Sequence, residues 1–139
     1  MQWCRRFLPI TITDMPGGDH RVDPPQRIPP GRECMFEPLD RIILVQRHGS
    51  PSAHLWLEEL QRASIRAPIA AIVSSRDPTA PPRIELATDQ LAGRTCWRAV
   101  IDGLDRKNDL LAFAQAVEPE LKTLWNAVLR ASGDQANHK

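Results

Sequence analysis

The chain has 139 residues, of which 42% are hydrophobic and 25% charged, and its formal net charge is +1. This length suits one domain with a real core, and the balanced charge argues against a strongly cationic nucleic-acid binder. No apolar run approaches about 18 residues, so the sequence predicts no membrane-spanning helix.

The three cysteines, Cys4, Cys34 and Cys96, are widely spaced. They form no CxxC pair and no Cys/His pair at zinc-ligand spacing, so no metal site and no cofactor are predicted. An odd number of scattered cysteines also argues against a disulfide framework. Arg5 and Arg6 are not followed by the apolar stretch of a signal peptide, so we expect a cytoplasmic protein.

The first 38 residues hold seven of the 13 prolines. Proline fixes φ and lacks a backbone donor, so this segment cannot join a helix or a central strand, and we interpret 1–38 as an extended arm. Within it, 7–13 alternates as a half-buried edge strand does. Such segments dock on sheet edges. The candidate partner-binding residues are therefore Phe7, Ile10, Ile12 and Ile28.

The residues after the arm have the periodicities of a folded domain. Residues 41–46 form a continuous apolar run, typical of a strand buried on both faces. Ser50 followed by Pro51 is a helix start signal. Apolar residues at helical spacing predict a helix over 53–65, and a second strand follows at 69–73.

Two more strands are expected at 83–87 and 95–101, and a helix is the alternative for the second of them. Asp105 is the expected cap of the next helix. Glu118-Pro119 interrupts that helix, and an apolar stripe over 121–129 predicts the last one.

These elements predict one globular domain at 39–132 and a disordered tail at 133–139. The first strand, helix and strand form a right-handed unit with parallel strands. The next two strands are antiparallel, because the loop between them is short. The expected fold is mixed α/β (α+β), with a four-stranded mixed sheet in βαβ-ββα order.

This order resembles the core of thioredoxin-like proteins. Residues 43–52 (ILVQRHGSPS) are similar to the thioredoxin stretch in which a buried strand leads to the CxxC motif, and Pro82 stands where that family places its cis-proline. The resemblance covers residues 39–117 and implies a fold rather than an activity, because no cysteine lies at 48–52. The family's helix between its second and third strands is missing or reduced to 74–80. A ferredoxin-like or other mixed-sheet domain is the alternative.

The segment that starts at Arg47-His48-Gly49 carries the candidate chemistry. It follows a buried strand and opens a helix, where free amides and the helix dipole favour an anion. The candidate anion-binding residues are Arg47, His48, Ser50 and Ser52. The Arg-His-Gly triplet resembles that of the histidine phosphatases, which implies a phosphoryl-accepting histidine. The other basic groups that this family needs are not evident here, and an ordinary loop is the plain alternative.

Two functions follow from these observations. The lack of a complete catalytic set favours a small non-enzymatic binding or adaptor protein, whose arm and sheet edge contact a protein partner or a second copy of the chain. The alternative is a small phosphate- or anion-binding domain, or an enzyme, centred on Arg47 and His48. The first function predicts that deleting 1–38 removes an interaction, and the second that His48→Ala abolishes phosphate binding or turnover.

Overall fold

The structure, a computed structural model, describes residues 12–13, 26–50, 52–105, 107 and 109–130. The elements, in chain order, are a 3₁₀ helix η1 (Glu33–Met35), β1 (Ile42–Arg47), α2 (Ser52–Arg62), β2 (Ile69–Ser75), β3 (Arg83–Leu91), β4 (Arg94–Asp102), α3 (Leu110–Ala116) and α4 (Glu118–Arg130). They belong to two compact units, one built from 26–40 and 55–67 and the other from 41–54 and 68–130.

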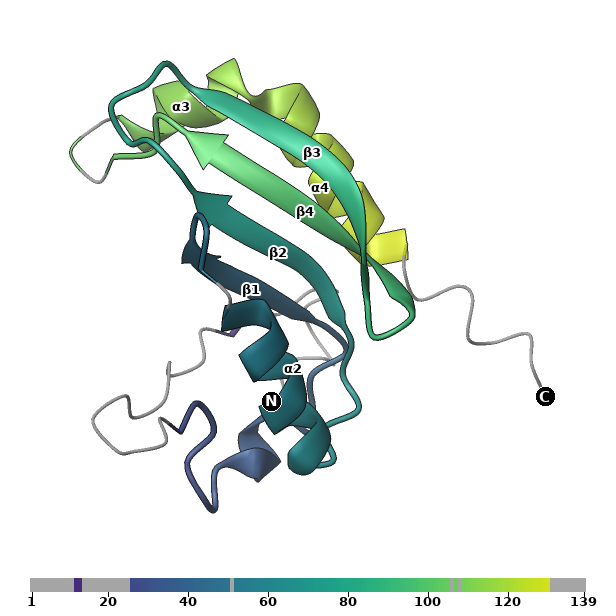
Figure 1. The fold of residues 1–139 in the computed structure, drawn as a ribbon. Coiled ribbons are helices and arrows are strands. Elements are labelled where there is room, and N and C mark those ends of the chain that lie inside the picture. Colours follow the sequence, from purple (N-terminus) through teal and green to yellow (C-terminus); the bar gives the residue numbers. More distant parts are fainter. Residues whose placement is uncertain (1–11, 14–25, 51, 106, 108, 131–139) are drawn as a thin grey trace. The chain divides into compact units, whose positions relative to one another are not determined.

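The second unit contains a four-stranded mixed sheet in the order β1-β2-β4-β3 (Figure 1). β1 pairs with β2 in parallel, β2 pairs with β4 in parallel, and β3 and β4 are antiparallel. This confirms the mixed α+β class and the four-stranded mixed sheet. β4 lies between β2 and β3, so β1 and β3 form the two edges.

Residues 94–102 form a strand, which decides between the two alternatives for this segment. A two-residue loop of Ala92 (φ 51) and Gly93 (φ 74) joins β3 to β4. Positive φ at both central residues is the geometry of a type I′ turn, whose twist matches that of an antiparallel hairpin. The register runs from Leu91 opposite Arg94 to Arg83 opposite Asp102.

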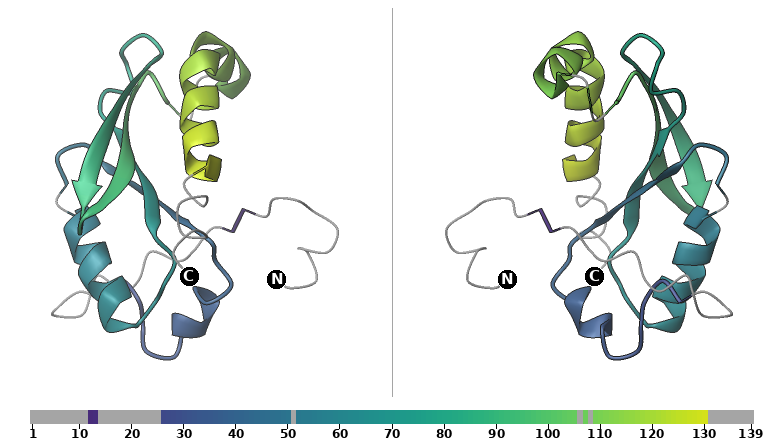
Figure 2. Two further views of the ribbon diagram at one scale, coloured as in Figure 1. Left: turned by 90° about the vertical axis from the view of Figure 1, so that its right-hand side faces the viewer. Right: turned by 90° about the vertical axis from the view of Figure 1, so that its left-hand side faces the viewer.

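One face of the sheet carries the apolar core of this unit. Figure 2 shows α3 and α4 on that face, with α4 along β3 and β4. The buried members of the cluster, which come from β3, β4, α3 and the residue that follows α3, are Ile84, Ala99, Ile101, Phe113 and Val117. Such burial of aliphatic and aromatic side chains is the main source of stability for a unit of this size.

The cap of α3 differs from the prediction. Asp109, rather than Asp105, is the N-cap residue, and its Oδ1 accepts hydrogen bonds from the amides of Leu111 (2.8 Å) and Ala112 (3.3 Å). Asp105 accepts the amide of Lys107 at 3.1 Å. Aspartate forms both kinds of local bond, so composition alone does not tell the turn residue from the cap.

The prediction that β1 is buried on both faces is wrong. Ile42 and Leu44 are buried, whereas Ile43 is 42% exposed and Val45 is 79% exposed. The strand is at the sheet edge, and the helices on the face of Ile43 and Val45 pack over β3 and β4. An apolar run therefore marks a strand here without meaning that both of its faces are covered.

The first unit contains the described part of the predicted arm. Residues 26–38 are not extended throughout: the amide of Arg32 bonds to the carbonyl of Pro29 (3.1 Å) in a turn, and η1 follows. α2 ends where Ser64 has a φ of 58°, a helix C-terminal conformation. The expected edge strand at 7–13, apart from its last two residues, and the tail at 133–139 lie outside the described residues.

No helix in the described part of the chain combines the length and the apolar character that a membrane crossing requires.

Candidate functional site

Three parallel strands end at the same edge of the sheet, the place where open α/β sheets usually bind ligands. The register sets Arg47 beside Ser75, and Ser75 beside Ile101. The amide of His48 donates to the carbonyl of Ser75 (3.1 Å). The predicted anion residues Arg47 and His48 therefore lie at this end of the sheet, next to the residues that follow β2.

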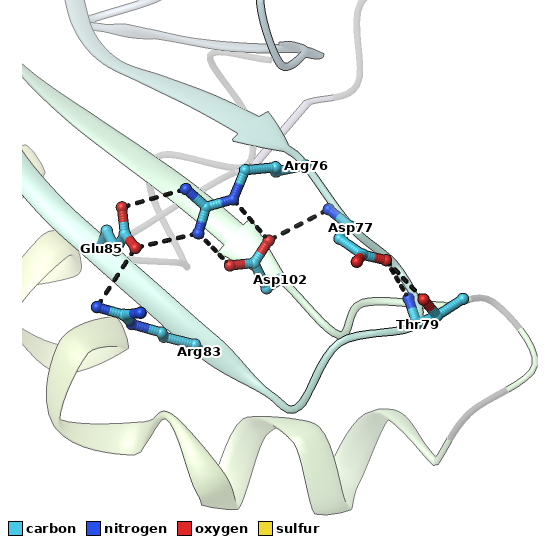
Figure 3. Close-up of polar contacts among 6 residues, drawn as sticks. All are labelled: Arg76, Asp77, Thr79, Arg83, Glu85 and Asp102. Carbon is cyan, nitrogen blue, oxygen red and sulfur yellow. Dashed lines mark hydrogen bonds and ion pairs between the residues drawn. The ribbon is translucent and has the colours of Figure 1, made fainter.

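The dominant feature at this end is an ion-pair network around Arg76 (Figure 3). Arg76 makes a bidentate contact with Asp102, with Nε at 3.0 Å from Oδ1 and Nη2 paired with Oδ2. Its Nη1 and Nη2 also reach the carboxylate of Glu85, at 3.4 and 3.0 Å. Arg83 pairs with Glu85 at 3.3 Å, and the amide of Asp77 donates to Asp102 at 3.2 Å. Bidentate pairs of this kind are among the stronger polar contacts in proteins.

The charges in this network stabilise one another. Hydrogen bonding to Arg76, against the opposing effect of desolvation, holds the pKa of Asp102 below its usual value, and the Asp77 amide adds to this. The hydrogen bonds and charge of Arg76 likewise lower the pKa of Glu85. The two carboxylates in turn raise the pKa of Arg76. Arg76 is thus held by carboxylates of its own chain rather than presented to an external anion.

The network also fixes the segment between β2 and β3. The amide of Arg76 bonds to the carbonyl of Ile101 (2.9 Å), and the amide of Gly103 bonds to the carbonyl of Asp77 (2.7 Å). Gly103 has a φ of +76°, and a Cβ at this position would lie 2.6 Å from the carbonyl oxygen of Ala80. Only glycine fits such a position. We interpret the network as a structural connection between the ends of β2 and β4.

The predicted anion-binding residues lie between the end of β1 and the start of α2. Arg47 and His48 are exposed, Gly49 (φ +76°) turns the chain, and Ser50 is partly buried. The side chain of Ser52 is outside the described residues. No group of three His, Cys, Asp or Glu side chains in the described part of the chain is arranged to hold a metal ion.

A second feature of this unit is the edge formed by β1. By the alternation of a strand, Ile43 and Val45 share the sheet face of their register partners Ala71 and Val73. Ala71 is fully buried, and Val73 packs against the core cluster. The exposed pair therefore continues the apolar face of the sheet beyond the part that α3 and α4 cover.

One side of the β1 backbone points away from β2. The amide of Ile42 bonds to the carbonyl of Pro68 (2.9 Å), and that of His48 bonds to Ser75. Because alternate residues of a strand point their amides to opposite sides, those of Ile43, Val45 and Arg47 point away from β2. Within the described residues β2 is the only strand paired with β1.

The predicted partner-binding residues fall in different places. Ile12 is described and is 81% exposed. Ile28 is buried, and its amide and that of Arg27 donate to Oε2 of Glu59, at 2.9 and 2.7 Å. Arg27 also forms an ion pair with Glu59 at 3.0 Å. Phe7 and Ile10 lie outside the described residues.

Sequence analysis did not single out Arg76, Asp102 or Glu85 as a set. Arg76 and Asp77 lie in a proline-rich connection, and the partners of Arg76 are far along the chain. The pairing of β2 with β4 would have pointed to them, because it sets a residue after β2 beside the end of β4. That signal needs the strand order, which the chain order alone does not give.

Comparison with known proteins gives this site no family: no family model matches the chain, nor does any curated protein or solved structure. The resemblance to thioredoxin-like proteins stays a prediction from the sequence. The function is therefore argued from the chemistry of the two features above.

Proposed function

We propose that this chain is a non-enzymatic binding protein whose β1 edge accepts an extended segment of a protein partner as an additional strand. The observation that supports this function best is the exposure of Ile43 and Val45, 42% and 79%, on an edge strand of the sheet. Soluble proteins usually protect edge strands with charge, proline or a covering element. An exposed apolar stretch of an edge strand is a known docking surface for extended peptides.

β1 has both the main-chain groups and the apolar side chains that such docking uses. The outward amides and carbonyls at 43, 45 and 47 would form main-chain bonds with the added strand, which gives affinity for extended segments in general. Apolar side chains opposite Ile43 and Val45 would add burial, and complete burial of one such side chain contributes roughly 1.5–3 kcal/mol. No catalytic group is required for this function.

The N-terminal arm is a second proposed contact. Glu59 holds Arg27 and Ile28 through three hydrogen bonds, so the chain that precedes them starts from a defined point on α2. Ile12, with Phe7 and Ile10, remains a proposed partner-contacting set. Proposed partners are another protein or a second copy of the chain, and the proposed location is the cytoplasm.

The test begins with selection of extended peptides that bind the full chain from a display library of random heptapeptides. Binding of the selected peptides is then measured by fluorescence anisotropy for the wild type and two matched variants. Val45→Lys places a charge on the β1 edge, whereas Thr88→Lys places the same charge on the same face at the β3 edge. Thr88 is exposed and lies on β3.

We expect the selected peptides to bind the wild type and Thr88→Lys alike, and to bind Val45→Lys at least about tenfold more weakly, since a lysine there opposes burial of the added strand. Circular dichroism checks that both variants keep the fold. Equal binding to all three proteins, or no selected peptide at all, contradicts the proposal.

A further inference from the structure

The β1 edge carries charge as well as apolar surface. Arg41 directly precedes the strand and Arg47 ends it, at positions that alternate with the same phase as Ile43 and Val45. The sequence of this face is therefore Arg, Ile, Val, Arg. Arg47 is exposed and Arg41 is partly exposed. Neither arginine forms an ion pair within the part of the chain that the structure describes.

These two arginines differ from Arg76, Arg83 and Arg98, and resemble Arg94 of β4, which also has no ion pair within the described residues. Arg76 and Arg83 contact Glu85, and Arg98 pairs with Asp89. A carboxylate therefore faces each of these three paired arginines. At the β1 edge the two positive charges flank an exposed apolar pair, and the described structure supplies no such carboxylate.

We infer that the segment accepted by β1 is acidic at both ends, with the pattern acidic-x-apolar-x-apolar-x-acidic, and belongs to another protein. This inference rests on the proposed function. An added strand sets its residues directly opposite those of β1, with side chains about 5 Å apart. Apolar residues would then face Ile43 and Val45, and a carboxylate would face each arginine. The pattern reads the same in both directions, so it holds for parallel and antiparallel addition.

The positions of the two arginines also argue against a second copy of β1 as the added strand. Antiparallel pairing that sets Ile43 opposite Val45 also sets Arg41 opposite Arg47, and like charges directly opposite are destabilising. Pairing centred on Val45 sets Ile43 opposite Arg47 instead. Pairing centred on Ile43 sets Arg41 opposite Val45. Each of these registers loses either the charge match or the apolar match that an acidic peptide keeps.

The probes are three fluorescein-labelled heptapeptides with a common Thr-Val-Thr-Val-Thr centre and Asp, Asn or Lys at both ends. Each is titrated against the full chain, and anisotropy gives the dissociation constants. We expect the Asp peptide to bind about fivefold more tightly than the Asn peptide, because two partly exposed charge pairs increase affinity by about this factor. The Lys peptide is expected to bind more weakly than both, and added salt to reduce the differences.

The double variant Arg41→Glu/Arg47→Glu is the matched control, because it reverses the charge of the edge and leaves Ile43 and Val45 in place. The preference should reverse, with the Lys peptide binding most tightly. If the three peptides bind the wild type equally and all lose affinity for Val45→Lys, the acidic pattern is wrong while the β1 docking function stands. If none binds, or if binding ignores Val45→Lys, the docking function itself fails.

The oligomeric state tells whether another protein or a second copy of the chain binds to the β1 edge. Light scattering coupled to size exclusion is run on the wild type and on Val45→Lys at matched concentrations. A monomer in both cases agrees with an acidic segment of another protein as the occupant. A wild-type dimer that Val45→Lys dissociates would show that a second copy occupies the edge, and would overturn the inference.

Discussion

The two edges of this sheet are built in different ways. On β3, Glu85 pairs with Arg76 and Arg83, and Asp89 pairs with Arg98. On β1, Ile43 and Val45 are exposed. Paired charges on an edge strand discourage pairing with another chain, whereas exposed β-branched residues favour it. For this reason we propose β1, rather than β3, as the edge that accepts a partner.

The helical layer follows the same division. α3 and α4 supply Phe113 and apolar residues of α4 to the face of β3 and β4. Ile43 and Val45 lie on the same face at the opposite edge of the sheet. Residues of α3 and α4 pack against β2, β3 and β4 on this face, whereas Ile43 and Val45 of β1 are exposed on it.

The largest difference in the free energy of unfolding is expected between truncation of a side chain under the helices and truncation of an exposed side chain of β1. Phe113→Ala removes a buried ring and should lower the free energy of unfolding by about 4 kcal/mol. Val45→Ala removes methyl groups that already contact solvent, and its effect should stay within about 0.5 kcal/mol. Urea denaturation of both variants measures this. Equal losses of unfolding free energy would show that Val45 is covered in solution, which contradicts the difference described between the two edges.

The connection between the ends of β2 and β4 can be disrupted by a substitution at Gly103. Gly103→Ala should cost about 3 kcal/mol, because the added methyl meets backbone atoms of the 80–82 segment and φ is positive. Gly93→Ala is the matched control: φ is also positive (+74°), but no atom lies within 4 Å of the added Cβ. That variant should cost about 1 kcal/mol. If both variants lose the same amount, the close approach at Gly103 contributes nothing.

The Arg76 network predicts a pH dependence of stability. The pKa values of Asp102 and Glu85 are lowered in the folded state, chiefly by Arg76. The unfolded chain therefore binds more protons in acid. The stabilisation is complete above the ordinary carboxyl values, near pH 4–4.5, and is lost as the pH falls through the lowered ones.

Asp102→Asn tests this dependence. The variant is expected to be less stable than the wild type at neutral pH. The difference should begin to shrink near pH 4, where the unfolded wild type takes up the proton, and should vanish below the lowered pKa of folded Asp102. Denaturation midpoints measured from neutral pH into acid give both curves. Curves that stay parallel over the whole range would show that Asp102 is not coupled to the pH dependence.

Most elements of the fold were predictable, and their arrangement was less so. Local signals predicted a strand at 69–73, which the structure extends to Ile69–Ser75, and the break before Pro119. Apolar runs and proline act within a few residues. The exposure of Val45 was not predictable, since it depends on which strand lies at the edge. That order is set when β4 inserts between β2 and β3, a long-range pairing that no local pattern records.

The candidate site shows the same limit. Arg47 and His48 were found from their position after a strand, and the structure does place them at the end of β1. The Arg76 network depends on the register of β2 against β4, because that register brings Asp102 within reach of Arg76. The edge position of β1 depends on the strand order. Both are properties of the assembled sheet rather than of any segment.

Residue-resolved amide hydrogen exchange tests the central claim most directly. NMR exchange rates of β1 are measured for the full chain alone and with the Asp-flanked heptapeptide in excess. We expect the amides of Ile43, Val45 and Arg47 to exchange rapidly in the free protein and to become protected when the peptide is bound. The amide of Leu44, which points toward β2, should change little. Uniform protection along β1, or protection confined to other strands, would contradict the claim that β1 accepts an added strand.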